Sequence, residues 1–186
     1  SFIKSISFLS FDMYQKVFPI KKNDSDVIII DIDEKSLNKF GQFPWNRSIF
    51  AKIIENVDAT NPKAIGFDVF FSEKDKQSPE EIIKSYNILA NDVIKYLVNI
   101  KGHDERFRQQ LESSKSVLAV LGSNVSSHGS YDRKAKARFL SKGGDPNQFT
   151  YNYPYSIGSL EQLEKSTKGL GSISFLDQTD GIIRSL

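Results

Sequence analysis

Cysteine is absent from the 186 residues of the chain, and histidine occurs only twice, as His103 and His128. The lack of cysteine excludes disulfide bonds, thiolate metal sites and cysteine nucleophiles, although it does not determine the redox compartment. The two histidines lie far apart in polar surroundings, and no serine has the flanking glycines of a nucleophile elbow. A Ser-His-Asp triad is therefore not indicated by any local motif.

The chain also lacks a strong charge imbalance and long apolar segments. Its net charge is only +2, with 26% charged and 39% hydrophobic residues, which is ordinary for a globular domain. We therefore expect no nucleic-acid partner. No apolar run approaches the roughly 20 residues of a membrane-spanning helix, and no signal peptide is recognisable. We expect residues 1–186 to form a single domain taken from a longer protein and truncated at its C-terminus.

Residues 27–71 have the pattern of a strand, a helical crossover and a second strand. The runs 27–30 and 64–71 are continuously apolar, which predicts parallel strands buried on both faces. Between them we expect a helix over 34–40, capped by Asp33 or Ser36 and ended by Gly41, and then a second helix capped by Asn46. The crossover is expected to be right-handed.

The remainder of the chain continues this alternation. The pattern predicts helices over 2–18, over 78–98, after Asp104 and around Leu163, and strands over 116–122 and 169–176. Asp180-Gly181 lies between two apolar runs and predicts a hairpin. The fold class is thus α/β, with a mostly parallel central sheet flanked by helices and a C-terminal antiparallel hairpin. Residues 123–156 are polar and partly basic, which indicates a loop-rich insertion.

Carboxylates are expected at the C-terminal ends of the first two strands, where open parallel sheets bind ligands. Asp31 and Asp33 end the first strand, and Asp68 lies near the end of the second. One interpretation is Mg²⁺-dependent phosphoryl transfer, because Asp31-x-Asp33 after an apolar strand resembles the haloacid dehalogenase-type phosphatases. That resemblance implies Asp31 as nucleophile and Asp33 as acid/base. However, the glycine of that family's motif is replaced by Glu34.

The alternative interpretation is structural, and it is the one we favour. Asp33 would cap the helix 34–40, while Asp31 and Asp68 would accept backbone N–H groups or pair with Arg47. Trp45 is expected in the core, and Gly66 indicates close approach of another backbone.

A larger set of residues resembles the type-two CHASE domain, an extracellular sensory module. The resemblance is carried by Asp31-Ile32-Asp33-Glu34, Phe43-Pro44-Trp45-Asn46-Arg47 and the stretch 64–71. The positions that fit the family motif are Asp12, Ser36, Gly41, Pro44, Trp45, Gly66, Phe71, Asp177, Asp180, Gly181 and Arg184.

The resemblance implies an extracytoplasmic input domain of a membrane receptor whose output is a histidine kinase, a nucleotide cyclase or a similar module. It implies no catalytic activity, cofactor or metal in the domain itself, attachment to the membrane through flanking spans, and a homodimeric receptor. The helix 2–18 is our first candidate for the dimer interface. We expect an unidentified small ligand or ion to bind around Asp31, Asp33, Arg47, Asp68 and Glu73.

Overall fold

The computed structural model describes residues 2–19, 26–86, 88, 90–126, 142–145, 148 and 150–174. The chain divides into two compact units, residues 1–42 and residues 43–186. Each unit is described by itself. Among the described residues, no helix combines the length and the apolar character needed to cross a bilayer.

The first unit contains two helices, α1 (Phe2–Val17) and α2 (Glu34–Phe40). Both helices were predicted. Asp33 caps α2, since its Oδ1 accepts the backbone N–H of Ser36 at 2.9 Å. Gly41 ends α2 with a φ of 87°, a left-handed conformation that glycine adopts without steric cost.

The strand predicted over 27–30 is wrong. These four residues form no strand, and their side chains are 63–88% exposed. An apolar run becomes a buried strand only where a neighbouring strand supplies hydrogen bonds and a packing surface. The described part of the unit 1–42 contains helices and extended backbone, but no strand that could pair with it.

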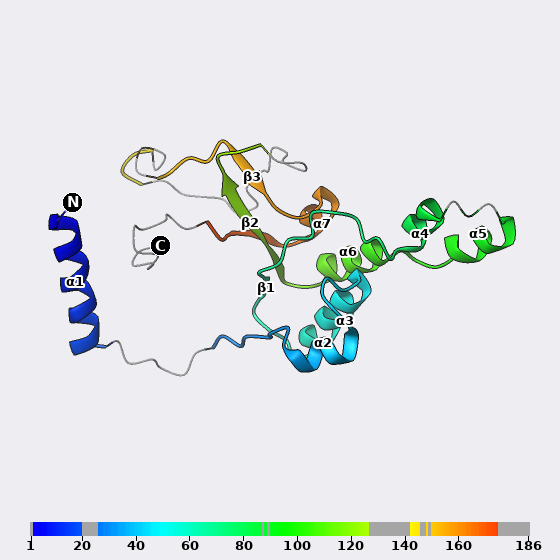
Figure 1. The fold of residues 1–186 in the computed structure, drawn as a ribbon, viewed down its shortest axis with the longest axis horizontal. Helices are drawn as coiled ribbons and strands as arrows, with labels where there is room; N and C mark the ends of the chain where they lie inside the picture. The colour runs from blue at the N-terminus through cyan, green and yellow to red at the C-terminus, as the bar shows by residue number, and fades with distance from the viewer. Residues whose placement is uncertain are drawn as a thin grey trace. The chain divides into compact units, whose positions relative to one another are not determined.

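The second unit is an α/β arrangement, as predicted (Figure 1). Its elements are α3 (Arg47–Asp58), β1 (Ile65–Phe67), α4 (Pro79–Ser85), α5 (Asn91–Val98), α6 (His103–Ser113), β2 (Ser116–Ser123), β3 (Tyr155–Ile157), α7 (Glu161–Ser166) and β4 (Gly169–Ser172). The expected hairpin at Asp180-Gly181, the motif residues Asp177 and Arg184, and most of the insertion 123–156 lie outside the described residues.

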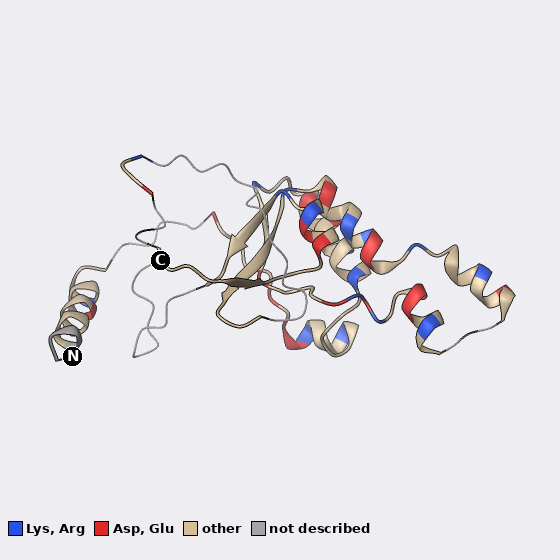
Figure 2. Cartoon of the chain, turned by 90° about the horizontal axis from the view of Figure 1, so that it is seen from above, with Lys and Arg blue, Asp and Glu red and all other residues tan. Residues whose placement is uncertain are grey.

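Strand β2 is the centre of the sheet and pairs with each of the other strands. It runs parallel to β1, with Ile65 opposite Ser116, and parallel to β4, with Val117 opposite Gly169. It runs antiparallel to β3, with Leu121 opposite Ile157. The predicted parallel character therefore holds for two of these three pairings. Figure 2 shows the strands free of charged residues, which lie on the helices and loops instead.

The core lies where α3, α6 and α7 cover the sheet. Phe50 of α3, Phe107 of α6 and Phe71 after β1 form an aromatic cluster, with ring centroids 4.8–6.0 Å apart. Around it, buried aliphatic side chains come from α3, α6, β2 and α7: Ile54, Leu111, Leu118 and Leu163. Burial of these side chains supplies the main favourable free energy of folding for this unit.

The predicted helix over 78–98 is divided in two. Helix α4 ends at Ser85, with Tyr86 as its C-cap residue, and the backbone at Ala90 is extended with a φ of −71° and a ψ of 111° before α5 begins. Asn91 and Asp92 then open α5, where an acidic side chain in the first turn interacts favourably with the helix dipole. In both views α4 and α5 lie beyond α6, away from the sheet (Figures 1 and 2).

The two glycines of the paired strands β1 and β2 have different surroundings. The close approach predicted at Gly66 is wrong, because a Cβ there would meet no atom within 4 Å. At Gly122 of β2, a Cβ would lie 2.2 Å from the ring of Tyr153. The aromatic ring therefore rests on the backbone of β2, and only glycine leaves room for it.

Candidate functional site

The candidate site begins at the turn that leads into α3. Asn46 caps this helix, because its Oδ1 accepts the N–H of Ile49 at 3.3 Å. The preceding peptide bond, Phe43–Pro44, is cis. Trp45 is 5% exposed and packs beside Phe50, which confirms the expected core position. The same turn also faces a cavity.

The cavity has a volume of about 440 Å³ and lies between this turn and the loop 69–77. Its wall contains the apolar side chains of Phe43, Pro44 and Trp45, and it contains Arg47 at the start of α3. The loop contributes both charged and apolar residues to the lining. Its volume lies within the range of about 300–1,000 Å³ that small-molecule sites have.

The loop is held in place by Asp75, a carboxylate only 5% exposed. Asp75 Oδ2 accepts the backbone N–H of Arg47 at 2.6 Å and lies 3.1 Å from Nδ1 of His103, while Oδ1 accepts the N–H of Gln77 at 2.8 Å. A carboxylate can only accept, so His103 must carry a proton on Nδ1. Asp75 thus connects the loop to the N-terminal ends of both α3 and α6.

Arg47 joins the loop to α6 through its side chain. Its Nη2 donates to the carbonyl oxygen of Glu73 at 3.0 Å, and its guanidinium carbon lies 4.6 Å from the centroid of the Phe71 ring. Its Nε faces Asp104 Oδ1 at 3.6 Å, but neither atom has a hydrogen-bond partner among the described residues. The Arg47–Asp104 pair is therefore electrostatic without a hydrogen bond.

Burial governs the protonation of this pair. Removal from water raises the pKa of Asp104, and the N–H of Asp75 and the charge of Arg47 only partly oppose this rise. Burial also lowers the pKa of Arg47 against the attraction of Asp104 and Asp75. Both pKa shifts favour the neutral forms, so the mutual attraction does not fully offset the cost of desolvation.

The start of α6 completes the cluster. Ser78 is the N-cap residue of α4, but its side chain makes no capping hydrogen bond there. Instead, Ser78 Oγ accepts the backbone N–H of His103 at 3.1 Å. Asp104 Oδ2 accepts the N–H of Asp75 at 3.0 Å. We call Arg47, Asp75, His103 and Asp104 the clamp, because together they fix the loop 69–77 to α3 and α6.

The structure separates the residues that the sequence placed at one site. It brings together Arg47 and the main chain of Glu73. Asp68 is exposed, and no described hydrogen bond or ion pair involves it. The pairing of Arg47 with Asp68 is therefore wrong, because Asp75 and Asp104 take that place.

Asp31 and Asp33 belong to the other unit. Asp31 is exposed. Asp33 accepts both the N–H and the hydroxyl of Ser36, and these bonds lower the pKa of its carboxyl group. This is the capping role that was predicted.

Sequence reasoning missed Asp75, His103 and Asp104 as partners of Arg47. Asp104 carried a detectable signal, since an acid in the first turn of a helix lies near backbone donors. Asp75 carried none, because it occurs in a polar loop between two lysines, Lys74 and Lys76.

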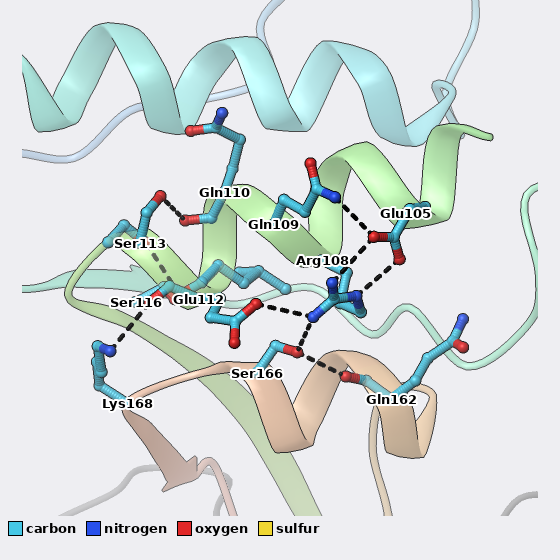
Figure 3. Close-up of polar contacts among 12 residues, drawn as sticks. Glu105, Arg108, Gln109, Gln110, Glu112, Ser113, Ser116, Gln162, Ser166 and Lys168 are labelled. Atoms are coloured by element: carbon cyan, nitrogen blue, oxygen red, sulfur yellow. Dashed lines mark hydrogen bonds and ion pairs between the residues drawn. The ribbon is translucent and has the colours of Figure 1, made fainter. Parts of the chain in front are cut away.

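A second polar cluster lies between α6 and α7 (Figure 3). Arg108 donates to Glu105 and Glu112 on its own helix and to Ser166 Oγ on α7. Hydrogen bonds to these two carboxylates raise the pKa of Arg108. Lys168 donates to the carbonyl oxygen of Glu112, as the same figure shows. The three donors drawn on Arg108 all reach acceptors, so this cluster supports helix packing.

Metal coordination finds no support in the part of the chain that the structure describes. No group of three or more His, Asp or Glu side chains there could hold a metal ion.

Comparison with known families decides which family the chain belongs to. The family model of the CHASE2 domain matches residues 2–186. The chain belongs to the CHASE2 family. CHASE2 domains are sensory domains of signalling receptors, found on the extracellular side of the membrane, and they are not catalytic. Comparisons with curated proteins and with solved structures found no match.

Within this CHASE2 domain, the turn and the loop around the cavity coincide with residues of the motif. Pro44 and Trp45 line the cavity, and Phe71 forms part of both the core and the cavity wall. The clamp lies directly beside them, since Arg47 follows the turn by two residues.

Proposed function

We propose that this CHASE2 domain is the extracytoplasmic input domain of a membrane-bound receptor with a histidine kinase, nucleotide cyclase or similar output. The receptor responds to a small ligand or ion that binds in the cavity between the Trp45 turn and the loop 69–77. The observation that carries this proposal is the cavity of about 440 Å³ beside a loop that is bonded to two helices.

A ligand shifts such a receptor only if it prefers one of two conformations. We infer that the loop 69–77 is the element that changes, because it forms one wall of the cavity and the clamp connects it to α3 and α6. A ligand that alters the position of Glu73 or Asp75 alters the contacts of Arg47 and His103 at the start of both helices. We therefore expect the positions of α3 and α6 to change when the ligand binds.

The location of the domain is tested by labelling a single introduced cysteine. The chain has no cysteine, so Ser85→Cys on the exposed face of α4 gives one unique site within it. A membrane-impermeant maleimide added to intact cells is expected to label this residue in the complete receptor. Labelling only after lysis would contradict an extracytoplasmic location.

The sensory role is tested by replacing this domain with a flexible linker in the complete receptor. We expect the output to lose its dependence on external conditions while the output module remains active. A receptor that is still regulated normally after the replacement would show that the domain is a spacer.

We further propose that the receptor is a homodimer and that α1 contributes to its interface. The residues Ile6, Leu9, Met13 and Val17 repeat at helical spacing and are 47–69% exposed. In membranes, Met13→Cys is expected to form a disulfide-linked dimer on oxidation, whereas Gln15→Cys on the opposite side of the helix is not. Equal cross-linking at both positions would contradict this interface.

A further inference from the structure

The residues that line the cavity carry several hydrogen-bond donors that are available to a ligand. Within the described structure, the backbone N–H groups of Ser72, Glu73 and Lys74 enter no hydrogen bond. The Nη1 atom of Arg47 and the ammonium group of Lys74 likewise have no described hydrogen-bond or ion-pair partner. All of these groups belong to residues that line the cavity.

The side-chain carboxylates on the same wall are already engaged. The carboxylate of Asp75 receives three donors, and the carbonyl oxygen of Glu73 receives Arg47 Nη2. The carboxylate of Glu73 pairs with Lys76 at 3.3 Å. A cationic ligand therefore meets carboxylates that already have partners, whereas an anionic ligand meets Arg47 Nη1 and the ammonium group of Lys74, which have no described partner.

The charges of the lining residues favour the same kind of ligand. Lys76 is paired with Glu73, and the charge of Arg47 is compensated by Asp75 and Asp104, so Lys74 is the cationic lining residue for which no ion pair is described. Lys74 is exposed, and its only other described influence is on Glu81, whose pKa it helps to lower. It can therefore turn toward a bound anion without breaking a described ion pair.

The rest of the wall is apolar and aromatic. Phe43 and Trp45 lie on one side, and Val69 and Phe70 lie at the start of the loop. Such surfaces favour an apolar or aromatic group on the ligand, because this group removes them from water. An inorganic anion alone would leave the apolar surface exposed to water.

We propose that the cavity binds a small organic anion, namely a carboxylate attached to an apolar or aromatic group. The carboxylate accepts from Lys74, Arg47 Nη1 and the loop amides, and the apolar group packs against Trp45 and Phe43. This inference rests on the proposed sensory function, because it names the ligand class of that site.

The chain provides its own reporter for this proposal, since Trp45 is its only tryptophan and lines the cavity. The purified chain is titrated with three probes of one shape: benzoate, which is anionic, benzamide, which is neutral, and benzylamine, which is cationic at neutral pH. We expect benzoate to change the Trp45 emission along a saturable curve and to raise the melting temperature. Benzamide and benzylamine should bind at least about tenfold more weakly, since a charge-assisted hydrogen bond is roughly twice as strong as a neutral one.

A pair of lysine variants assigns the binding to the cavity. Lys74→Gln removes the available ammonium group and should weaken benzoate binding about tenfold, because one lost charged contact is worth about that factor. Lys52→Gln changes an exposed lysine on α3 that pairs with Glu55, and it should leave binding unchanged. Lys74 is exposed, so folding should be preserved in both variants.

Several outcomes would overturn the ligand class. One is equal or stronger binding of benzamide or benzylamine, and another is an unchanged affinity in Lys74→Gln. A third is the absence of any saturable response to benzoate in both emission and melting temperature. If benzylamine alone saturates, the cavity binds cations, and the sensory function survives while the anion proposal fails. These binding measurements do not decide the sensory function itself, which the linker-replacement experiment tests.

Discussion

Replacement of Asp75 by alanine is expected to be among the most destabilising changes in this domain. Asp75 is 5% exposed and accepts hydrogen bonds from Arg47, Gln77 and His103. The substitution leaves two backbone N–H groups and one imidazole without their acceptor. It also removes one of the two carboxylates that compensate the charge of the buried Arg47.

The magnitude follows from the number and type of bonds lost. Each hydrogen bond to a charged group contributes about 1.5–3 kcal/mol net. Water can reach the loop from the cavity, so the three losses do not add fully. We therefore expect the free energy of unfolding to fall by about 3–5 kcal/mol, as for the loss of one partner of a buried ion pair. Asp75→Asn keeps one acceptor oxygen and should cost roughly half as much on the same scale.

The assay is urea denaturation followed by the emission of Trp45, which reports on the unit 43–186. Asp68→Ala is the matched control, because Asp68 is exposed and enters no described hydrogen bond. Its effect should stay within about 0.5 kcal/mol. The reasoning is refuted if Asp75→Ala costs less than about 1 kcal/mol, or if Asp68→Ala costs as much as Asp75→Ala.

Three further predictions test other parts of the account. Gly122→Ala should lower the free energy of unfolding by about 1–3 kcal/mol, because the added Cβ would lie 2.2 Å from the ring of Tyr153. Gly66→Ala should not lower it, because the space around Gly66 is open. Equal denaturation midpoints for the two variants would contradict this packing. Burial raises the pKa of Asp104, so the folded state holds this proton more tightly, and stability should fall as the pH rises above the ordinary aspartate pKa of about 3.9. Asp104→Asn should flatten the stability curve measured between acidic and neutral pH, and an unchanged slope would show that Asp104 does not titrate in this way. With Mg²⁺ present, the chain should not hydrolyse p-nitrophenyl phosphate, and turnover abolished by Asp31→Asn would restore the phosphatase interpretation.

Local signals in the sequence predicted those parts of the fold that depend on neighbouring residues. Asp33 and Asn46 cap their helices as expected, because a capping side chain reaches only two or three residues along the chain. The apolar run of β2 also formed a strand, since it finds partners on both sides.

The errors arose where structure depends on distant partners. Residues 27–30 have the composition of a buried strand, yet composition does not supply the pairing strand. Asp75 and Asp104 lie 29 residues apart along the chain, and only the folded loop 69–77 brings both of them to Arg47. Sequence proximity identified Arg47 as the charged centre but gave it the wrong acidic partner, Asp68.

The most direct test of the account measures the output of the complete receptor in membrane vesicles, with benzoate added on the side that this domain faces. If the cavity is the input site, the output changes along the same saturation curve as the emission of Trp45. Lys74→Glu should then abolish the response, and Lys52→Glu should leave it intact. Saturation of the Trp45 signal with no change in output would contradict the central claim, because the cavity would then bind without signalling.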